Sequence, residues 1–243
     1  MLDVDQITHF KQHGYVILRG FINDATLGRW REQFWDHVGA RSGDPDTWPE
    51  DYVVKDFGVE PSFGGLPQMQ RVIAQLGGDM FGGGGGSMLV QWPKADTQWQ
   101  APTQGHIDGY GPGGWSGGFM LGATTYLEAV EAGGGAFYYW PDSHLPVQQY
   151  FQQHPEQIDG SFTERADWDE KGWGLFSEGC PTAPEEFIGA AGDVILWHYF
   201  MCHTGSHNVN TRPRRVVFSR WHRSDREQMK WDIPEDFWKY WNI

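Results

Sequence analysis

The chain has 243 residues and a formal net charge of −14 at pH 7, and we expect one domain over residues 1–243 with a full β-sandwich core. The negative charge disfavours nucleic acid and anionic membrane surfaces as partners, because both carry negative phosphates. No stretch approaches the roughly 20 apolar residues that a membrane-spanning helix needs. The two cysteines give no disulfide framework, and the first residues lack a signal-peptide pattern. We expect a cytoplasmic protein and infer no oligomeric state.

The amino-terminal residues predict a short helix followed by a strand. The segment from Asp5 to His13 has the composition of a helix, Gly14 is a helix stop, and a strand is predicted from Tyr15, within the segment that ends at Phe21.

Five consecutive glycines occupy positions 82–86. A phosphate-binding loop would continue into Gly-Lys-Ser/Thr and a helix, and neither follows. We therefore interpret the run as a flexible loop. The apolar residues Met88 to Trp92 predict a strand directly after it.

His106 and Asp108 indicate two ligands of a metal site. Residues two apart on a strand project to the same side, so these side chains point one way while Ile107 packs on the other face. The pair alone is weak evidence, because the chain has ten histidines and a polar loop gives the same pattern. A third ligand must come from elsewhere in the chain.

The third ligand is expected at His203. Residues 192–198 predict a turn and a short apolar strand that leads to it. His198, at the end of that strand, is the competing ligand, but His203 is favoured by its Gly-Ser-x-Asn context and by Arg214, eleven residues later. Arg214 opens another predicted strand, where its guanidinium can bind a carboxylate through two hydrogen bonds while Arg215 points outward. Two imidazoles and one carboxylate leave the opposite side of an Fe(II) ion open for a co-substrate and O₂.

In this order the segments resemble the phytanoyl-CoA dioxygenase family of Fe(II)- and 2-oxoglutarate-dependent oxygenases. The resemblance runs from about Asp3 to about Trp221. It rests on the amino-terminal helix and strand, the His-x-Asp pair, the glycine turn and aromatic strand at 133–144, and the segment from Gly192 to Trp221. It implies a mainly β fold with flanking helices around a double-stranded β-helix (jelly roll, cupin-like) core.

The resemblance implies a role for each matching residue. His106, Asp108 and His203 match the catalytic Fe(II) ligands, and Arg214 matches the residue that binds the distal carboxylate of 2-oxoglutarate. Met88 and Thr124 match positions that line the co-substrate pocket. The family often has Gly-Ser-Gly after the distal histidine, whereas this chain has Thr-Gly-Ser at 204–206, so a serine contact is not carried over. The presence of Asp108 disfavours a halogenase, since halogenating members have a small residue there.

The aromatic content bears on the substrate. Fourteen tryptophans exceed ordinary use, and we assign roughly two-thirds of them to core packing and the rest to facing a small molecule. Candidate substrate contacts are Gln91, Tyr110, Trp115 and Trp197. We expect hydroxylation or oxidative cyclisation of a saccharide or other secondary metabolite, as a tailoring step in biosynthesis. Hydroxylation of an acyl-CoA is an alternative, disfavoured because the chain has few basic residues for the coenzyme phosphates.

Two further alternatives stay open at this stage. The jelly roll could bind a small molecule without turnover and keep the metal as a structural element, or it could be a cupin-like metalloenzyme that uses no 2-oxoglutarate. Arg214 argues against the first, since a structural metal needs no anchor for a co-substrate. The affinity for 2-oxoglutarate of the wild type and of Arg214→Ala separates these cases.

Overall fold

The computed structural model describes residues 1–49, 57–94, 97–108, 119–158, 180–229 and 232–243, and the backbone of the strand pair at 110–111 and 114–115. The helices are α1 (Val4–His13), α2 (Asp24–Val38), α3 (Pro67–Gly77), α4 (His144–Gln153) and α6 (Arg226–Met229), with 3₁₀ turns at Pro45–Thr47, Gly78–Met80 and Pro155–Gln157. The strands are β1 (Tyr15–Leu18), β2 (Phe81–Gly83), β3 (Ser87–Gln91), β4 (Tyr110–Gly111), β5 (Gly114–Trp115), β6 (Phe119–Tyr126), β7 (Phe137–Tyr139), β8 (Glu185–Phe187), β9 (Val194–His198), β10 (His203–Gly205) and β11 (Arg214–Arg223). Across these described residues, no helix combines the length and apolar character that crossing a membrane requires.

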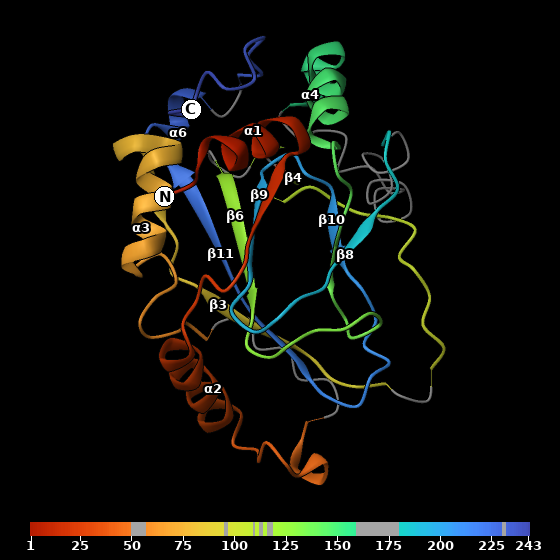
Figure 1. Cartoon of the computed structure of the whole chain (residues 1–243). Helices are drawn as coiled ribbons and strands as arrows, with labels where there is room; N and C mark the ends of the chain where they lie inside the picture. The colour runs from red at the N-terminus through yellow and green to blue at the C-terminus, as the bar shows by residue number, and fades with distance from the viewer. Residues whose placement is uncertain are drawn as a thin grey trace.

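Antiparallel pairing builds a large and a small sheet. The large sheet has the order β1-β9-β6-β11-β2, and β3 also pairs with β11, whereas the small sheet has the order β10-β7-β8. Figure 1 shows β8 and β10 across from the large sheet, with α2 and α3 along its other side. The phenol of Tyr126 joins the sheets, because its hydroxyl accepts from the Phe137 amide at 2.8 Å and donates to the Phe187 carbonyl at 2.7 Å. The mainly β jelly roll with flanking helices is the fold that the sequence predicted.

The amino-terminal elements form as the sequence predicts. Asp3 caps α1 in a capping box with Gln6, and Gly14 ends the helix with a φ of 77°, a left-handed conformation that favours glycine. Strand β1 follows at once and pairs with β9, Tyr15 opposite Trp197. The amino-terminal strand β1 is thus an edge strand of the large sheet.

Strand β11 separates two environments by the alternation of its side chains. Arg215 points toward the helices, where its guanidinium lies 4.8 Å from the ring of Phe34 and 4.7 Å from that of Trp35 on α2. Arg214 and Arg220 lie on the opposite face, which is turned toward the small sheet. This inner face carries the candidate site.

The prediction of a flexible loop for the glycine run is wrong in part, because the run begins in strand β2 and is closely packed at Gly84 and Gly86, although Gly82 and Gly85 have open space where a Cβ would be. Gly82 and Gly83 pair with β11, and the Gly84 amide donates to the Arg220 carbonyl at 2.9 Å. A Cβ on Gly84 would lie 2.5 Å from the indole nitrogen of Trp221, and its φ is 80°. The chain passes so close to Trp221 and to Gly64, whose amide bonds the Gly84 carbonyl, that no side chain fits.

Candidate metal centre and co-substrate site

A pair of backbone hydrogen bonds brings the first and third metal-ligand candidates together. The His106 amide donates to the His203 carbonyl at 3.0 Å, and the His203 amide donates to the His106 carbonyl at 2.9 Å. Residues paired in this way in an antiparallel ladder point to the same side. The sequence predicted a strand at this position, but the structure has only an isolated bridge there, followed by a turn at Asp108. Ile107 is buried in the core, as expected.

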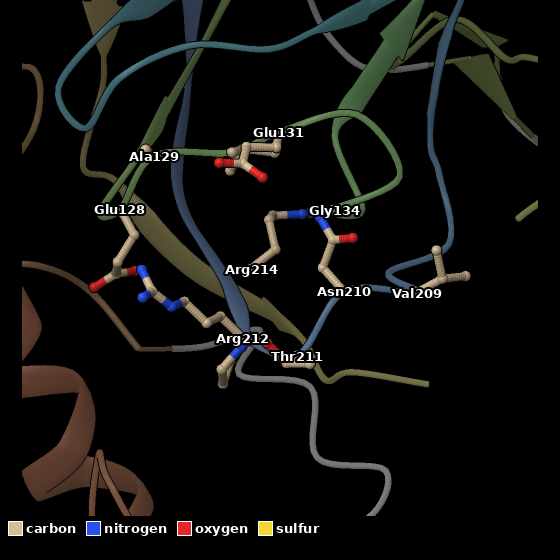
Figure 2. A pocket seen from close by; sticks show the side chains of 11 residues that line it. Glu128, Ala129, Glu131, Gly134, Val209, Asn210, Thr211, Arg212 and Arg214 are labelled. Atoms are coloured by element: carbon tan, nitrogen blue, oxygen red, sulfur yellow. The ribbon is translucent and has the colours of Figure 1, made fainter. Parts of the chain in front are cut away.

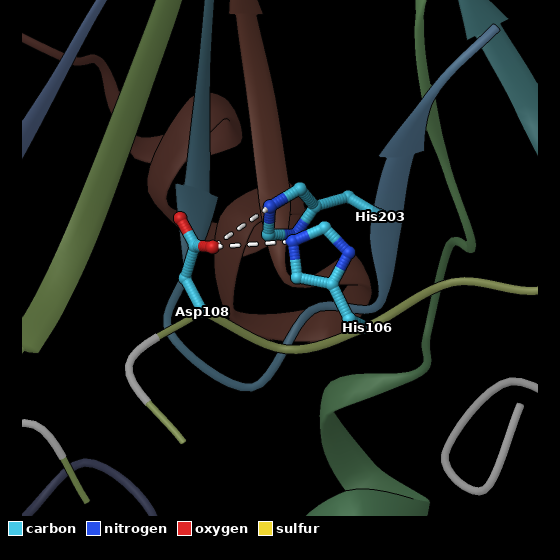
Figure 3. Close-up of side chains that lie close together, drawn as sticks. All are labelled: His106, Asp108 and His203. Atoms are coloured by element: carbon cyan, nitrogen blue, oxygen red, sulfur yellow. Dashed lines mark ion pairs between the residues drawn. The ribbon is translucent and has the colours of Figure 1, made fainter. Parts of the chain in front are cut away.

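The three side chains converge as a metal site requires (Figure 3). The Nε2 atom of His106 lies 3.3 Å from Oδ1 of Asp108, and Nε2 of His203 lies 3.6 Å from the same oxygen. One ligand atom from each residue lies within 4.8 Å of the other two. First-row metals bind such nitrogen and oxygen atoms at about 2.0–2.2 Å, so one ion can contact all three.

The tautomer of His203 is fixed by its surroundings. Its Nδ1 lies 3.0 Å from the Met201 carbonyl, and because a carbonyl only accepts, Nδ1 carries the proton and Nε2 is left with a lone pair for a metal. The ring packs against Trp197, 4.3 Å away between centroids, and stacks on Phe137 at 5.1 Å. These apolar neighbours keep water from one side of the site.

The pKa values of His106 and Asp108 favour the binding of a cation by the cluster. Burial, followed by the neighbouring His203, lowers the pKa of His106 from its ordinary value. Burial raises the pKa of the Asp108 carboxyl, but His203, His106 and Arg220 together outweigh it and hold that pKa well below its usual range. At neutral pH the cluster therefore presents a neutral His106 and an ionised Asp108.

The competing ligand, His198, lies elsewhere. It is fully buried on the outer face of β9, stacked on Phe237 at 4.6 Å and on Trp241 at 5.3 Å. Its Nδ1 accepts from the Phe200 amide at 3.1 Å. The structure brings His203, and not His198, to His106 and Asp108.

Arg214 is a buried cation on the inner face. Its side chain is 6% exposed, and it forms no ion pair with a carboxylate in the part of the chain that the structure describes. Its Nε donates to the Gly135 carbonyl, and one Nη donates to Oε1 of Gln91 at 2.9 Å. Neither partner neutralises the guanidinium, and its burial lowers the pKa of Arg214. A buried charge with only neutral partners costs several kcal/mol, which is typical of a site that binds an anion.

Gly205 connects this cation to the metal cluster. A Cβ on Gly205 would lie 3.5 Å from Nη2 of Arg214, and Gly205 follows His203 by two residues on β10, on the same face of the strand. Two residues of strand span about 6.6 Å, a separation that a five-carbon dicarboxylate bridges. Ser206 turns away, with its hydroxyl 3.3 Å from Oε1 of Glu186.

The other predicted residues divide between the two faces of the large sheet. Met88 pairs with Val217 and is fully buried on the helix-covered face, so it does not reach the co-substrate side. Met88 was predicted to line the co-substrate pocket, but the face of β3 that carries Gln91, the partner of Arg214, has Ser87 and Leu89 beside it instead of Met88. Gln91 is a hydrogen-bond partner of Arg214.

Thr124 and Trp197 lie on the inner face. Thr124 pairs with Phe218 of β11 and is 4% exposed. Trp197 covers Gly122, where a Cβ would lie 2.1 Å from the indole, and is 2% exposed. The backbones of Tyr110 and Trp115 pair with each other, and their side chains lie outside the described residues.

Sequence reasoning missed Arg220. Its Nε donates to Oδ2 of Asp108 at 2.6 Å, and one Nη contacts the same oxygen. The metal side of the carboxylate, Oδ1, stays turned toward the two histidines. The alternation along β11 from Arg214 was the available signal, since residue 220 falls on the same face.

A cavity of about 480 Å³ lies at the Arg214 end of β11 (Figure 2). Glu128 and Glu131 border it from the loop after β6, and Asn210 and Arg212 border it from the loop before β11. None of the three metal-ligand candidates is among its described lining residues. Arg214 itself is one of its lining residues.

No protein-family model and no curated protein matches the sequence. Solved structures do match. EvdO2 from Micromonospora carbonacea var. aurantiaca is 18% identical at a TM-score of 0.61, with 95% of this chain and 97% of that chain covered. HygX from Streptomyces hygroscopicus, with nickel and 2-oxoglutarate bound, is 14% identical at a TM-score of 0.57, with 93% and 88% covered. SnoN, a non-haem α-ketoglutarate-dependent epimerase from nogalamycin biosynthesis, is 17% identical at 0.54, with 90% and 82% covered. This chain has their fold.

Proposed function

We propose that the protein is an Fe(II)- and 2-oxoglutarate-dependent dioxygenase that oxidises a C–H bond of a small molecule. The observation that carries the proposal is Arg214, a buried guanidinium whose partners among the described residues are neutral. It lies beside Gly205, which is two strand positions from His203. A structural metal site has no use for such a cation. A co-substrate with a carboxylate at one end and a metal-chelating 2-oxo acid at the other accounts for both features.

The chain's own residues position the reactants. His106, Asp108 and His203 would hold the ion from one side. Gln91 accepts a hydrogen bond from Arg214, which would bind the distal carboxylate of 2-oxoglutarate. Trp197 excludes water from the ring of His203. When bound, iron with 2-oxoglutarate and O₂ supplies oxidative decarboxylation to succinate and CO₂, coupled to oxidation of the substrate carbon.

A tailoring step on a saccharide or other secondary metabolite is the proposed reaction class. It is supported by the similar structures, of which one holds nickel, 2-oxoglutarate and hygromycin B and another is a carbocyclase from nogalamycin biosynthesis. The aromatic inner face around Trp197 and Phe137 suits a ring-shaped molecule. The outcome at the oxidised carbon, hydroxylation or oxidative cyclisation, depends on how that molecule lies.

The test is an anaerobic titration of the Fe(II)-loaded protein with 2-oxoglutarate. We expect the weak visible charge-transfer band of the chelate in the wild type. Arg214→Met should shift the titration to much higher concentrations, and His203→Ala should abolish the band. Absence of the band in a wild type that binds Fe(II) would overturn the proposal in favour of a metal-binding jelly roll with other chemistry or none.

A further inference from the structure

An open cleft of about 520 Å³ lies at the end of β11 opposite Arg214. Its walls are the backbone of Gly85 and Gly86, Ser87 at the start of β3, and the side chains of Phe218, Arg220 and His222. The side chain of Arg220 is 41% exposed, lines the cleft and also contacts Asp108. One side chain therefore separates this cleft from the metal cluster.

Arg220 is the one permanently charged side chain among the described residues that line the cleft. The protein has a net charge of −14, yet no carboxylate is among the described residues that line the cleft. Arg220 is its cation, and His222 is held neutral by burial and by the nearby Arg226 and Arg220, which lower its pKa. An anion or a strong hydrogen-bond acceptor suits this surface, and an ammonium group does not.

The shape of the cleft favours a ring. The guanidinium of Arg220 lies over the ring of Phe218, 5.0 Å from its centroid. On the facing wall, Gly85 carries no side chain and leaves open space where a Cβ would be. A flat molecule can lie against this backbone with its edge toward Arg220.

The contact with Asp108 couples the cleft to the metal. Without an ion, the charge of Arg220 is balanced by Oδ2 of Asp108. An ion at Oδ1 would draw on the same carboxylate charge, so more of the positive field of Arg220 would act on a ligand in the cleft. By linkage, an anion in the cleft must then strengthen metal binding by the same factor.

We propose that this cleft binds the prime substrate and that Arg220 selects it, admitting a ring-shaped small molecule that carries an oxyanion and rejecting a cationic amine. The inference rests on the proposed function and adds a substrate class to it. Arg220 would hold the acidic group of the substrate beside Asp108, which sets the distance between that group and the carbon that is oxidised. An acidic saccharide and an acidic aromatic polyketide share this chemistry.

The experiment uses simple probes with Ni(II) in place of iron. Benzenesulfonate is the anionic ring, chosen because sulfonates coordinate metals poorly, and benzylamine is the cationic one. Calorimetric titration into the Ni(II)- and 2-oxoglutarate-loaded protein should show saturable binding of benzenesulfonate and none of benzylamine. The affinity for benzenesulfonate should fall about tenfold when the metal is removed, a coupling within the usual range.

Three variants locate the effect. Arg220→Met should abolish selectivity for the sulfonate, and Arg220→Lys should keep part of it. Phe218→Leu leaves the contact between Arg220 and Asp108 in place. It should weaken the binding of benzenesulfonate without changing the affinity for Ni(II). Arg226→Met is the matched control: it removes a nearby cation that does not line the cleft, and benzenesulfonate should bind to it as to the wild type within about twofold.

Three outcomes would contradict the proposal for the cleft. Equal binding of the two probes, no saturable binding of the sulfonate, or equal losses in Arg226→Met and Arg220→Met would overturn the assignment of the cleft. The charge-transfer titration with 2-oxoglutarate is read separately on the same wild-type protein. If that band forms while the probes fail to discriminate, only this inference is lost, whereas absence of the band removes the proposed function itself.

Discussion

Substitution of Gly84 by alanine tests whether the glycine run is a packed part of the fold. The new Cβ would lie 2.5 Å from the indole nitrogen of Trp221, at a backbone φ of 80°. Gly82, two residues earlier, has open space where its Cβ would be and pairs regularly with His222. Gly82→Ala is therefore the matched control.

The expected cost of Gly84→Ala has two parts. A non-glycine residue in the left-handed region costs roughly 1–2 kcal/mol, and forcing a methyl group into a packed core costs typically about 1–3 kcal/mol. Together they predict a loss of about 3 kcal/mol in the free energy of unfolding. For a chain of this length, that lowers the Tm by about 6–12 °C.

Thermal unfolding followed by circular dichroism measures the difference between the two variants. Gly82→Ala should stay within about 2 °C of the wild type, as substitutions in open positions usually do. If Gly84→Ala and Gly82→Ala have the same Tm, the close approach of Gly84 to Trp221 does not constrain the chain. A large loss in both variants would instead indicate that any substitution in β2 is harmful and that packing at Gly84 is not the reason.

Three other outcomes are expected. His203→Ala should lose Co(II) binding while its far-ultraviolet circular dichroism is unchanged. His198→Ala should keep Co(II) binding but unfold at a lower temperature, because the substitution leaves a cavity among the aromatic rings around His198. The reverse pattern would exchange the roles of the two histidines. Arg214→Met should weaken the binding of 2-oxoglutarate by about 2–4 kcal/mol, or roughly 30- to 1,000-fold, because it removes a buried charge pair. Calorimetric titrations of the Ni(II)-loaded protein measure this affinity, and an unchanged value would place the carboxylate elsewhere. Burial lowers the pKa of His144 to about 4, below its unfolded value near 6.5. Because the unfolded chain then binds the proton more tightly, the free energy of unfolding should fall by up to about 3 kcal/mol as the pH drops from about 6.5 to 4. Urea unfolding of His144→Asn should show a shallower fall over this range, and an unchanged slope would contradict the assignment.

The sequence predicted the features that depend on local pattern. The helix stop at Gly14 and the strand that leads to His203 follow from short-range rules for glycine and apolar runs. The sequence context of His203 also favoured it over His198, and the structure brings His203 to His106 and Asp108. Each of these needs only the residues near it in the chain.

What the sequence did not predict depends on which strands become neighbours. The flexible interpretation of the glycine run failed because Trp221, which excludes a side chain at Gly84, is more than a hundred residues away in the chain. Met88 was placed in the wrong environment because a shift of one residue in a strand exchanges its two faces. The contact of Arg220 with Asp108 likewise joins distant segments.

The three residues of β10 have a consequence for the choice of co-substrate. His203 and Gly205 are joined by two peptide units, and Gly205 lies against Arg214. The spacing between the His203 side chain and the guanidinium therefore depends on a short paired strand and not on a long loop. If the proposed function is right, this strand would select dicarboxylic acids by their length. Oxaloacetate, one carbon shorter than 2-oxoglutarate, would leave the guanidinium unpaired, and 2-oxoadipate, one carbon longer, would have to buckle between its two anchors. Discrimination by chain length would thus be built into a three-residue strand of the small sheet.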